Sequence, residues 1–198
     1  MIPRPLKFGI AAMALVALVI GFFAGRERRL AHQTEPSVTE SRPVAPPPSG
    51  ATEQVTLYVA YVAPGVLLPQ SSVIPLPSGR QQRAEELLHA LMDIYAGKTS
   101  QHPLGPGADI RNVYLVDPGL AVIDINTAFA SGHRSGILVE ELTVVSLVET
   151  LTANIPGITR VKILVNGKEQ DTLAGHADLS RIYEAASAGD LLNQMRAQ

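Results

Sequence analysis

Residues Ile137 to Val165 read ILVEELTVVSLVETLTANIPGITRVKILV, and this stretch decides the fold. Its first nineteen residues are mostly apolar and contain no turn signal, so they are too many for an ordinary strand, although their β-branched residues favour one. Apolar residues recur at spacings of three, four and seven, as they do on the buried face of a helix. We therefore predict a helix over Ile137–Ile155 with one broad face on a sheet. Pro156-Gly157 ends this helix, and a strand over Arg160–Val165 follows.

The composition of the chain excludes several classes of protein. The chain has 198 residues and a formal net charge of −2, without a long run of like charge, so we expect no nucleic-acid partner. It contains no cysteine, which excludes disulfides, a lipid-modified cysteine anchor, thiolate metal sites and cysteine nucleophiles. Any attachment to a cell envelope must therefore be made by the polypeptide itself.

The segment Phe8–Gly25 is eighteen residues long and uncharged. As a helix it would span about 27 Å, close to the thickness of the hydrocarbon core of a bilayer. We predict an uncleaved transmembrane helix, with residues 1–7 on the cytoplasmic side. A cleaved signal peptide is the alternative, because Arg4 and Lys7 give a positive start, but the apolar block is too long and no small-residue cleavage site follows it. Basic residues flank both ends, so the positive-inside rule does not fix the orientation.

Residues 26–51 contain few hydrophobic residues and end in a cluster of prolines. Such a segment cannot bury enough apolar surface to fold alone, and prolines keep it extended. We predict a flexible tether that holds the following domain away from the bilayer. Partner binding by Pro46-Pro47-Pro48 is the alternative.

The first half of the domain has one clear strand and one clear helix. Val55–Val62 alternates as a sheet strand does, whereas four prolines between Pro64 and Pro77 limit Val73-Ile74 to an edge or an irregular segment. Ser78 and Gln81 have the spacing of a capping box, which predicts a helix from there to about Ala96, closed by Gly97.

The second half adds strands around the long helix. Asn112–Val116 and Leu120–Asn126 alternate on either side of Asp117-Pro118-Gly119, which predicts a hairpin. After the strand Arg160–Val165, Asn166-Gly167 is a two-residue hairpin signal toward Glu169–Thr172. Short helices are expected over Ala177–Ala186 and Asp190–Arg196.

The order of these elements is strand, helix, strand, strand, helix, strand. It predicts an α+β fold of the split βαβ, ferredoxin-like type, with two helices on one face of a sheet and an extra C-terminal hairpin strand.

The order of the motifs also resembles a known family. The run ADIRNVYLVDPGLAVIDINTAF, the helix exit VETLTANIPGITRVKILVNGK and the later TLAGHADLS are together similar to the GerMN domain of sporulation and germination proteins. The resemblance covers residues 52–180, with residues 181–198 as a helical tail. It implies an extracytoplasmic envelope protein, anchored by a lipid or a membrane helix and linked to spore germination. Related folds build rings in sporulation channels, which implies a role in assembly.

The candidates for catalysis do not form a convincing set. His133, Asp124 and Ser146 are the residue types of a triad, but Ser146 lies inside the predicted helix and no nucleophile elbow surrounds it. Glu140 and Glu141 lie in the first turn of that helix, where the dipole favours negative charge. They are adjacent and point about 100° apart, so they cannot act as a facing pair.

The candidates for binding are equally weak. His176 and Asp178 are two residues apart without a second ligand cluster, which favours a loop that bonds its own backbone over a metal site. Gly105-Pro106-Gly107 lacks the lysine and the strand-to-helix context of a phosphate loop and is interpreted as a turn. We therefore expect no catalytic, cofactor-binding or metal-binding residue, and no cofactor.

These features together predict a non-enzymatic, single-pass membrane protein whose folded domain lies outside the cytoplasm. It would associate with itself or with envelope proteins through the sheet face or the strand edges that the helices leave uncovered. The alternative is a module that binds peptidoglycan or another cell-wall ligand. The chain has no tryptophan, four phenylalanines and five tyrosines, and such sparse aromatics weigh against a sugar-stacking surface.

Overall fold

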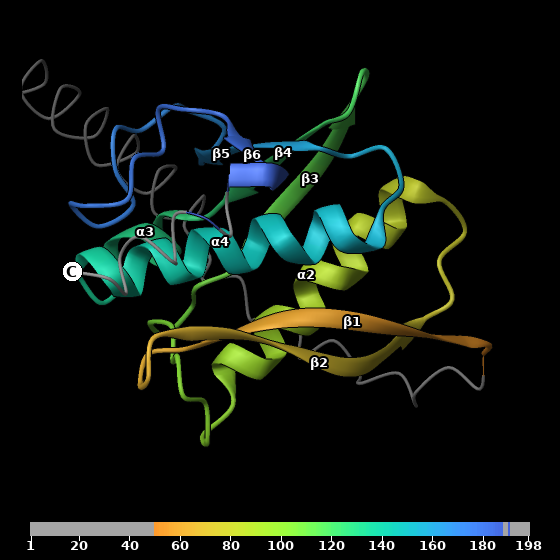
Figure 1. The fold of residues 1–198 in the computed structure, drawn as a ribbon, viewed down its shortest axis with the longest axis horizontal. Helices are drawn as coiled ribbons and strands as arrows, with labels where there is room; N and C mark the ends of the chain where they lie inside the picture. Colours follow the sequence, from red (N-terminus) through yellow and green to blue (C-terminus); the bar gives the residue numbers. More distant parts are fainter. Residues whose placement is uncertain (1–49, 188–189, 191–198) are drawn as a thin grey trace, which may run out of the picture. The chain divides into compact units, whose positions relative to one another are not determined.

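The computed structural model describes residues 50–187 and residue 190 (Figure 1). The predicted N-terminal segment 1–7, the predicted anchor Phe8–Gly25 and nearly all of the predicted tether lie outside these residues. So does the predicted helix Asp190–Arg196, apart from its first residue. Among the described residues, none of the helices combines the length and the apolar character needed to cross a membrane.

The order of the elements confirms the predicted α+β class. Two long strands, a helix, a hairpin and the long helix precede two further strands, in the order β1 (Thr52–Tyr61), β2 (Val66–Pro75), α2 (Arg80–Ala96), β3 (Ile110–Val116), β4 (Leu120–Ile125), α3 (Thr127–Ser131), α4 (Ile137–Asn154), β5 (Arg160–Val165) and β6 (Tyr183–Glu184). The long helix has the predicted start, and it ends with Ile155 as its C-cap. Val73-Ile74, expected to form an edge or an irregular segment, belongs to the ten-residue strand β2, which is one of the two strands of its sheet and so has an open edge.

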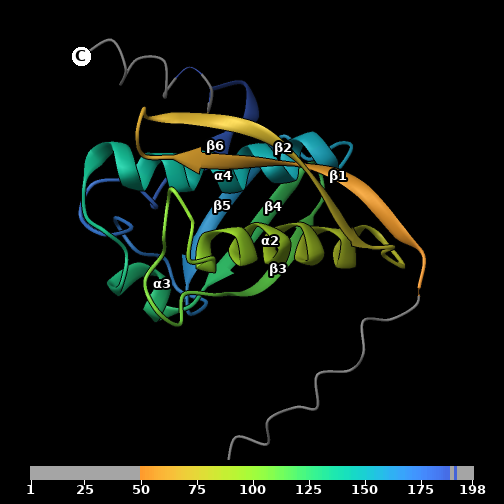
Figure 2. The ribbon, with the colours of Figure 1, turned by 90° about the horizontal axis from the view of Figure 1, so that it is seen from below.

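The strands form two separate sheets. β1 and β2 make an antiparallel ribbon, and β3, β4, β5 and β6 make a four-stranded sheet in that order. Within the four-stranded sheet β4 and β5 are parallel, joined by α4, and the outer pairs are antiparallel. Figure 1 shows α4 between the ribbon and the larger sheet. Figure 2 shows the ribbon lying along α4, and α2 crossing in front of β3, β4 and β5.

This layering explains the composition of α4. Every residue from Glu140 to Val148 is buried, so the helix has no solvent-exposed face over that length. A helix that neighbouring elements cover on all sides can carry apolar residues on every face. The predicted contact of one broad face with a sheet is therefore present, and the ribbon covers the helix from the other side.

A stripe of polar residues on α4 holds β1 in place. Asn154 donates from Nδ2 to the carbonyl of Thr56 (2.7 Å) and accepts from its N–H (3.3 Å). Four residues earlier, Thr150 accepts from the N–H of Tyr58 (3.0 Å), and Ser146 donates to the carbonyl of Tyr58 (2.6 Å). These side chains satisfy the backbone groups of β1 that point away from β2, in the way that a neighbouring strand would.

The predicted turns are present. Asp117-Pro118-Gly119 joins β3 to β4, with Gly119 at φ +71°. Asn166 and Gly167 have φ values of +50° and +72°, as a primed two-residue turn requires, and the turn closes through paired bonds between Val165 and Lys168 (2.8 and 3.1 Å).

The segment after this turn differs from the prediction. Beyond Lys168 the pairing stops, and the two-residue strand β6 pairs with β5 instead of Glu169–Thr172. The predicted helix over Ala177–Ala186 is wrong as far as Glu184, and helical residues begin at Ala185. Ala177 and Leu179 are buried two positions apart, a spacing that suits extended chain rather than helix.

The start of α2 differs in its capping. The N-cap is Gly79, and Ser78 donates from its backbone N–H (2.8 Å) and its hydroxyl (2.6 Å) to Oε1 of Gln82 rather than pairing with Gln81. Gln81 instead reaches the edge strand β3. Its amide donates to the carbonyl of Val113 and accepts from the N–H of Leu115 (3.3 Å).

Candidate functional site

A pocket of about 430 Å³ opens between α3, the loop that follows α3, and the loop that follows β5. Its walls carry hydroxyl and amide groups together with small apolar side chains, from Thr127, Ala130, Ser131, His133, Ser135, Gln170, Thr172, Leu173, Ala174 and Gly175. Aside from His133, none of these lining residues has an ionisable side chain.

Asn126 fixes the wall that α3 contributes. Its Oδ1 caps the helix by accepting from the N–H of Phe129 (2.7 Å), and its Nδ2 donates to the carbonyl of Gly107 (2.7 Å). Just before Gly107, a Cβ on Gly105 would collide with the carbonyl of Gly132, so glycine is needed where the two loops cross. Gly105-Pro106-Gly107 is thus a packing turn, as expected.

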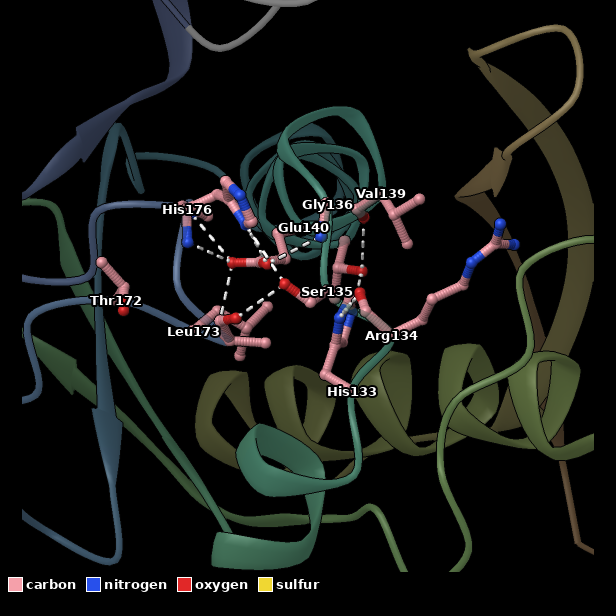
Figure 3. A network of polar contacts seen from close by, with 12 residues as sticks. His133, Arg134, Ser135, Gly136, Val139, Glu140, Thr172, Leu173 and His176 are labelled. Atoms are coloured by element: carbon pink, nitrogen blue, oxygen red, sulfur yellow. Dashed lines mark hydrogen bonds and ion pairs between the residues drawn. The ribbon is translucent and has the colours of Figure 1, made fainter.

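Glu140 fixes the opposite wall (Figure 3). Its side chain is fully buried. Oε2 accepts from the backbone N–H groups of Ala174 (3.0 Å), His176 (2.8 Å) and Ala177 (3.0 Å). Oε1 accepts from the N–H of Gly136 (3.0 Å) and lies 2.9 Å from Nδ1 of His176. One carboxylate therefore joins the start of α4 to the loop that contains His176, and we call this arrangement the Glu140 clamp.

The clamp keeps Glu140 ionised. Burial alone would raise the pKa of this carboxyl, but the N–H of Gly136, the His176 ring and the N–H groups of Ala177 and Ala174 together outweigh burial and lower the pKa to about 2. A carboxylate saturated with donors in this way has no lone pair directed at a ligand, so its role here is to position the loop.

The next residue has the opposite environment. Glu141 is 8% exposed, and its Oε2 has no hydrogen-bond partner within the described part of the chain. Burial raises the pKa of this carboxyl, and the positive charge of Arg181 offsets part of that effect. The two glutamates point to different surroundings, as their adjacency on a helix predicts.

Behind the pocket, two histidines share one threonine hydroxyl. His133 and His102 place their Nε2 atoms 2.7 and 2.6 Å from Oγ1 of Thr143. Nδ1 of His133 lies 2.8 Å from the carbonyl of Arg134, so this nitrogen carries the proton and Nε2 accepts from Thr143. His102 then donates from Nε2, which leaves its Nδ1 as an acceptor without a partner among the described residues.

Both rings are neutral in this arrangement. Burial, with smaller contributions from His133 and Arg134, lowers the pKa of His102 to about 4. Burial also lowers the pKa of His133, against the carbonyl of Arg134 and the charge of Glu140, which raise it. The pair is therefore a packed, uncharged support for the pocket floor at neutral pH.

The structure places the three triad candidates among different partners. Ser146 is bonded to the carbonyl of Tyr58 and lies 2.5 Å from the hydroxyl of Tyr95. Asp124 pairs with Arg111 (2.7 Å) and accepts from the N–H of Gly167 (2.6 Å). His133 is bonded to Thr143 and Arg134, as described above.

The two metal-site candidates also separate. His176 belongs to the Glu140 clamp, whereas Asp178 accepts from the backbone (2.8 Å) and the hydroxyl (2.6 Å) of Ser180. In residues 50–187 and 190, histidine and carboxylate side chains nowhere gather in groups of three or more suited to a metal ion.

Sequence reasoning missed the clamp and the role of His102. Apart from Gly136, the partners of Glu140 lie 34 to 37 residues away, so no local spacing reveals them. His102 lies in a loop rich in proline and glycine that has no periodicity. The one usable signal was a pair of adjacent glutamates within a mostly apolar helix.

Comparison with known proteins identifies the domain. A family model described as "Germane: Sporulation and spore germination" matches residues 56–171, more than half of the chain. The chain belongs to the Germane family. This membership confirms the GerMN resemblance. The donors of the Glu140 clamp at residues 174, 176 and 177 lie beyond the matched part of the Germane domain.

Three solved structures are similar to this chain. Tandem GerMN domains of the sporulation protein GerM from Bacillus subtilis match with a TM-score of 0.50 and 20% identity, covering 68% of this chain and 46% of that one. The first GerMN domain of GerM matches with a TM-score of 0.47 and 25% identity, covering 65% of this chain and 98% of that one. A candidate lipoprotein from Clostridium perfringens matches with a TM-score of 0.48 and 20% identity, covering 73% and 94%. Proteins of curated function give no match.

Proposed function

We propose that this protein is a non-enzymatic, membrane-anchored component of the bacterial cell envelope. Its Germane domain lies outside the cytoplasm and docks with envelope proteins or with other copies of the chain. The apolar segment Phe8–Gly25 and the proline-rich tether support the location, and the family supports a role in the envelope. The docking surface is the outer face of β3 and β4.

The apolar character of that face is the observation that carries the proposal. Tyr114 and Val116 on β3 are 49% and 45% exposed. The register places them beside Val122 and Leu120 of β4, which are half-buried on the same face. Four apolar side chains therefore lie together on the face that α2 and α4 do not cover. Contiguous exposed apolar surface of this kind is typical of interaction sites.

The sheet edges are less suited to docking than this face. The amide of Gln81 occupies the edge of β3, and the polar stripe of α4 occupies the edge of β1. On β2 the alternation places Pro69 and Pro75 at positions that point away from β1, where a new strand would need N–H donors. A partner would therefore pack on side chains rather than extend a sheet.

Structural roles for the polar candidates support a protein without catalytic activity. The carboxylate of Glu140 is saturated with donors, and Ser146 and Asp124 bond to backbone groups of other elements. A catalytic nucleophile or base needs a free lone pair or proton that faces a substrate.

The test is a charge placed on the proposed face. The double variant Tyr114→Glu, Val116→Glu should lose the crosslinked species that the full-length protein forms in cells, because two carboxylates oppose apolar docking. His89→Glu changes an exposed position on α2 and is the matched control, so this variant should keep the crosslinked species. Unchanged crosslinking and normal complementation by the double variant, at equal abundance, would disprove docking through this face.

A cell-wall ligand-binding module is the second candidate function. One observation favours it, which is the uncharged pocket between α3 and the Glu140 clamp.

A further inference from the structure

We propose that this pocket binds an uncharged saccharide that carries an acetamido group. The inference rests on the second candidate function, to which it gives a site and a ligand class. The pocket is lined by residues 127–135 and 170–175, so it shares no residue with the docking face on β3 and β4.

The charge of the site selects a neutral ligand. The lining contains no lysine, arginine, aspartate or glutamate. The carboxylate of Glu140, which holds the loop of Ala174, is fully buried and already bonded to four backbone N–H groups. Figure 3 shows the guanidinium of Arg134 directed away from Thr172 and Leu173. A charged ligand would lose its hydration here without gaining a counter-charge, whereas a neutral one has no such penalty.

The distribution of polar and apolar groups selects the acetamido saccharide. The hydroxyls of Ser131 and Thr172 line the pocket, and the side chain of Gln170 is exposed beside them. Nε2 of Gln170 donates to the carbonyl of Thr172 (2.6 Å), so this amide offers its oxygen to a ligand. Ala130 and Leu173 are buried and form an apolar floor. Hydroxyls and an amide at the rim suit the hydroxyls and amide of a sugar, and the floor suits a methyl group. Few precisely placed polar groups over an apolar lining are typical of ligand pockets.

The walls are held together before any ligand arrives. The side chain of Asn166 donates to the hydroxyl of Thr127, which ties the turn after β5 to the start of α3. Ser135 donates to the carbonyl of Ala174 (3.0 Å), and the Glu140 clamp holds the same loop from the other side. A pocket assembled in this way needs little ordering on binding, which favours affinity for a small ligand. Glu140 is therefore a positioning residue for the site.

Isothermal titration calorimetry of the full-length protein tests the proposal. The protein is kept in a detergent without a sugar headgroup and titrated with chitotetraose, an uncharged chain of N-acetylglucosamine. Cellotetraose is the matched ligand control, since it has the same linkage and a hydroxyl in place of each acetamido group. Ser131→Tyr fills the mouth of the pocket from an exposed position. His89→Tyr, at an exposed position on α2 outside the pocket, is the matched variant that leaves the pocket open.

We expect chitotetraose to bind with a dissociation constant of about 1 mM or tighter, and cellotetraose at least about tenfold more weakly. Ser131→Tyr should weaken binding at least about tenfold and His89→Tyr less than about threefold. Gln170→Ala, at a second exposed position, should also weaken binding. This result is independent of whether the Ser131→Tyr variant folds normally.

Absence of heat with chitotetraose would overturn the proposal. Affinity for chitotetraose equal to that of the wild type in both Ser131→Tyr and Gln170→Ala would also overturn it. If the wild-type protein bound cellotetraose as tightly as chitotetraose, the acetamido assignment would be overturned. Because the assay contains no envelope partner, a negative result removes the saccharide site and leaves the docking face, which is tested in cells, in place.

Discussion

Replacing the buried carboxylate of the Glu140 clamp should destabilise the domain strongly, whereas the same change one residue later should not. Glu140→Gln keeps the size of the side chain but leaves one acceptor oxygen where two oxygens now serve four backbone N–H groups and the His176 ring. Glu141→Gln is the matched control. It removes a carboxylate whose Oε2 has no partner in the described part of the chain.

The size of the effect follows from the pKa of Glu140. Its folded-state pKa is about 2, against an ordinary 4.5. One pKa unit corresponds to about 1.4 kcal/mol, so the ionised carboxylate contributes on the order of 3 kcal/mol to the free energy of unfolding at neutral pH. This agrees with the loss expected when a hydrogen-bonded buried charge is removed from its donors. Glu141→Gln should change the free energy of unfolding by less than about 1 kcal/mol, because burial disfavours that charge.

The pH dependence gives a second readout. A carboxyl with a lowered folded-state pKa contributes stability that is complete above pH 4.5 and is lost as the pH falls toward about 2. The difference between wild type and Glu140→Gln should therefore shrink to less than half of its neutral value by about pH 3.

Urea denaturation of residues 50–198, followed by circular dichroism at several pH values, measures both quantities. Equal stability of wild type and Glu140→Gln at pH 7, within about 0.5 kcal/mol, would refute the clamp. A loss in Glu141→Gln as large as that in Glu140→Gln would refute the contrast between the two environments.

Three further predictions concern the histidine pair, the turn and the membrane orientation. The folded-state pKa of His102, about 4, lies below its ordinary 6.5, so the contribution of His102 to stability is complete above pH 6.5 and lost as the pH falls toward 4. In urea denaturation, the free energy of unfolding should therefore fall less between pH 7 and pH 5 in His102→Gln than in the wild type. Gly167→Val places a β-branched residue at φ +72° and should lower the free energy of unfolding by about 1–3 kcal/mol, and an unchanged thermal melting temperature would contradict the strained turn. External protease on spheroplasts should cut the protein after about Arg29, whereas full protection behind an intact membrane would mean that the domain faces the cytoplasm.

Features set by neighbouring residues were predictable from the sequence. The length of α4, its end at Pro156-Gly157 and the turn at Asn166-Gly167 depend on local periodicity and backbone preference, and all three are present. The hairpin around Pro118 was predicted for the same reason.

Features set by distant contacts were not predictable. The separate ribbon of β1 and β2 depends on Ser146, Thr150 and Asn154, whose spacing of four marks a polar stripe but does not say which strand it meets. The Glu140 clamp closes a loop of more than thirty residues. Gln81 has a capping-box position, but its side chain bonds to β3. The edge of β3 presents unpaired backbone groups that the Gln81 amide can satisfy, whereas water can satisfy the exposed N–H groups at the start of the helix.

The pocket was missed for a related reason. Its walls come from two segments about forty residues apart, and its polar groups are serine, threonine and glutamine, which are common in loops. Such residues carry no distinctive spacing, so only the folded arrangement brings them together.

Site-specific photocrosslinking in cells tests most directly whether the Germane domain docks through the outer face of β3 and β4. A photoreactive residue is placed at position 114 of the full-length protein, and at position 89 on α2 as a control. Our account predicts a discrete crosslinked species from position 114 and none from position 89. Crosslinking from position 89 alone, or monomer only from both positions under conditions that trap a known envelope complex, would contradict it.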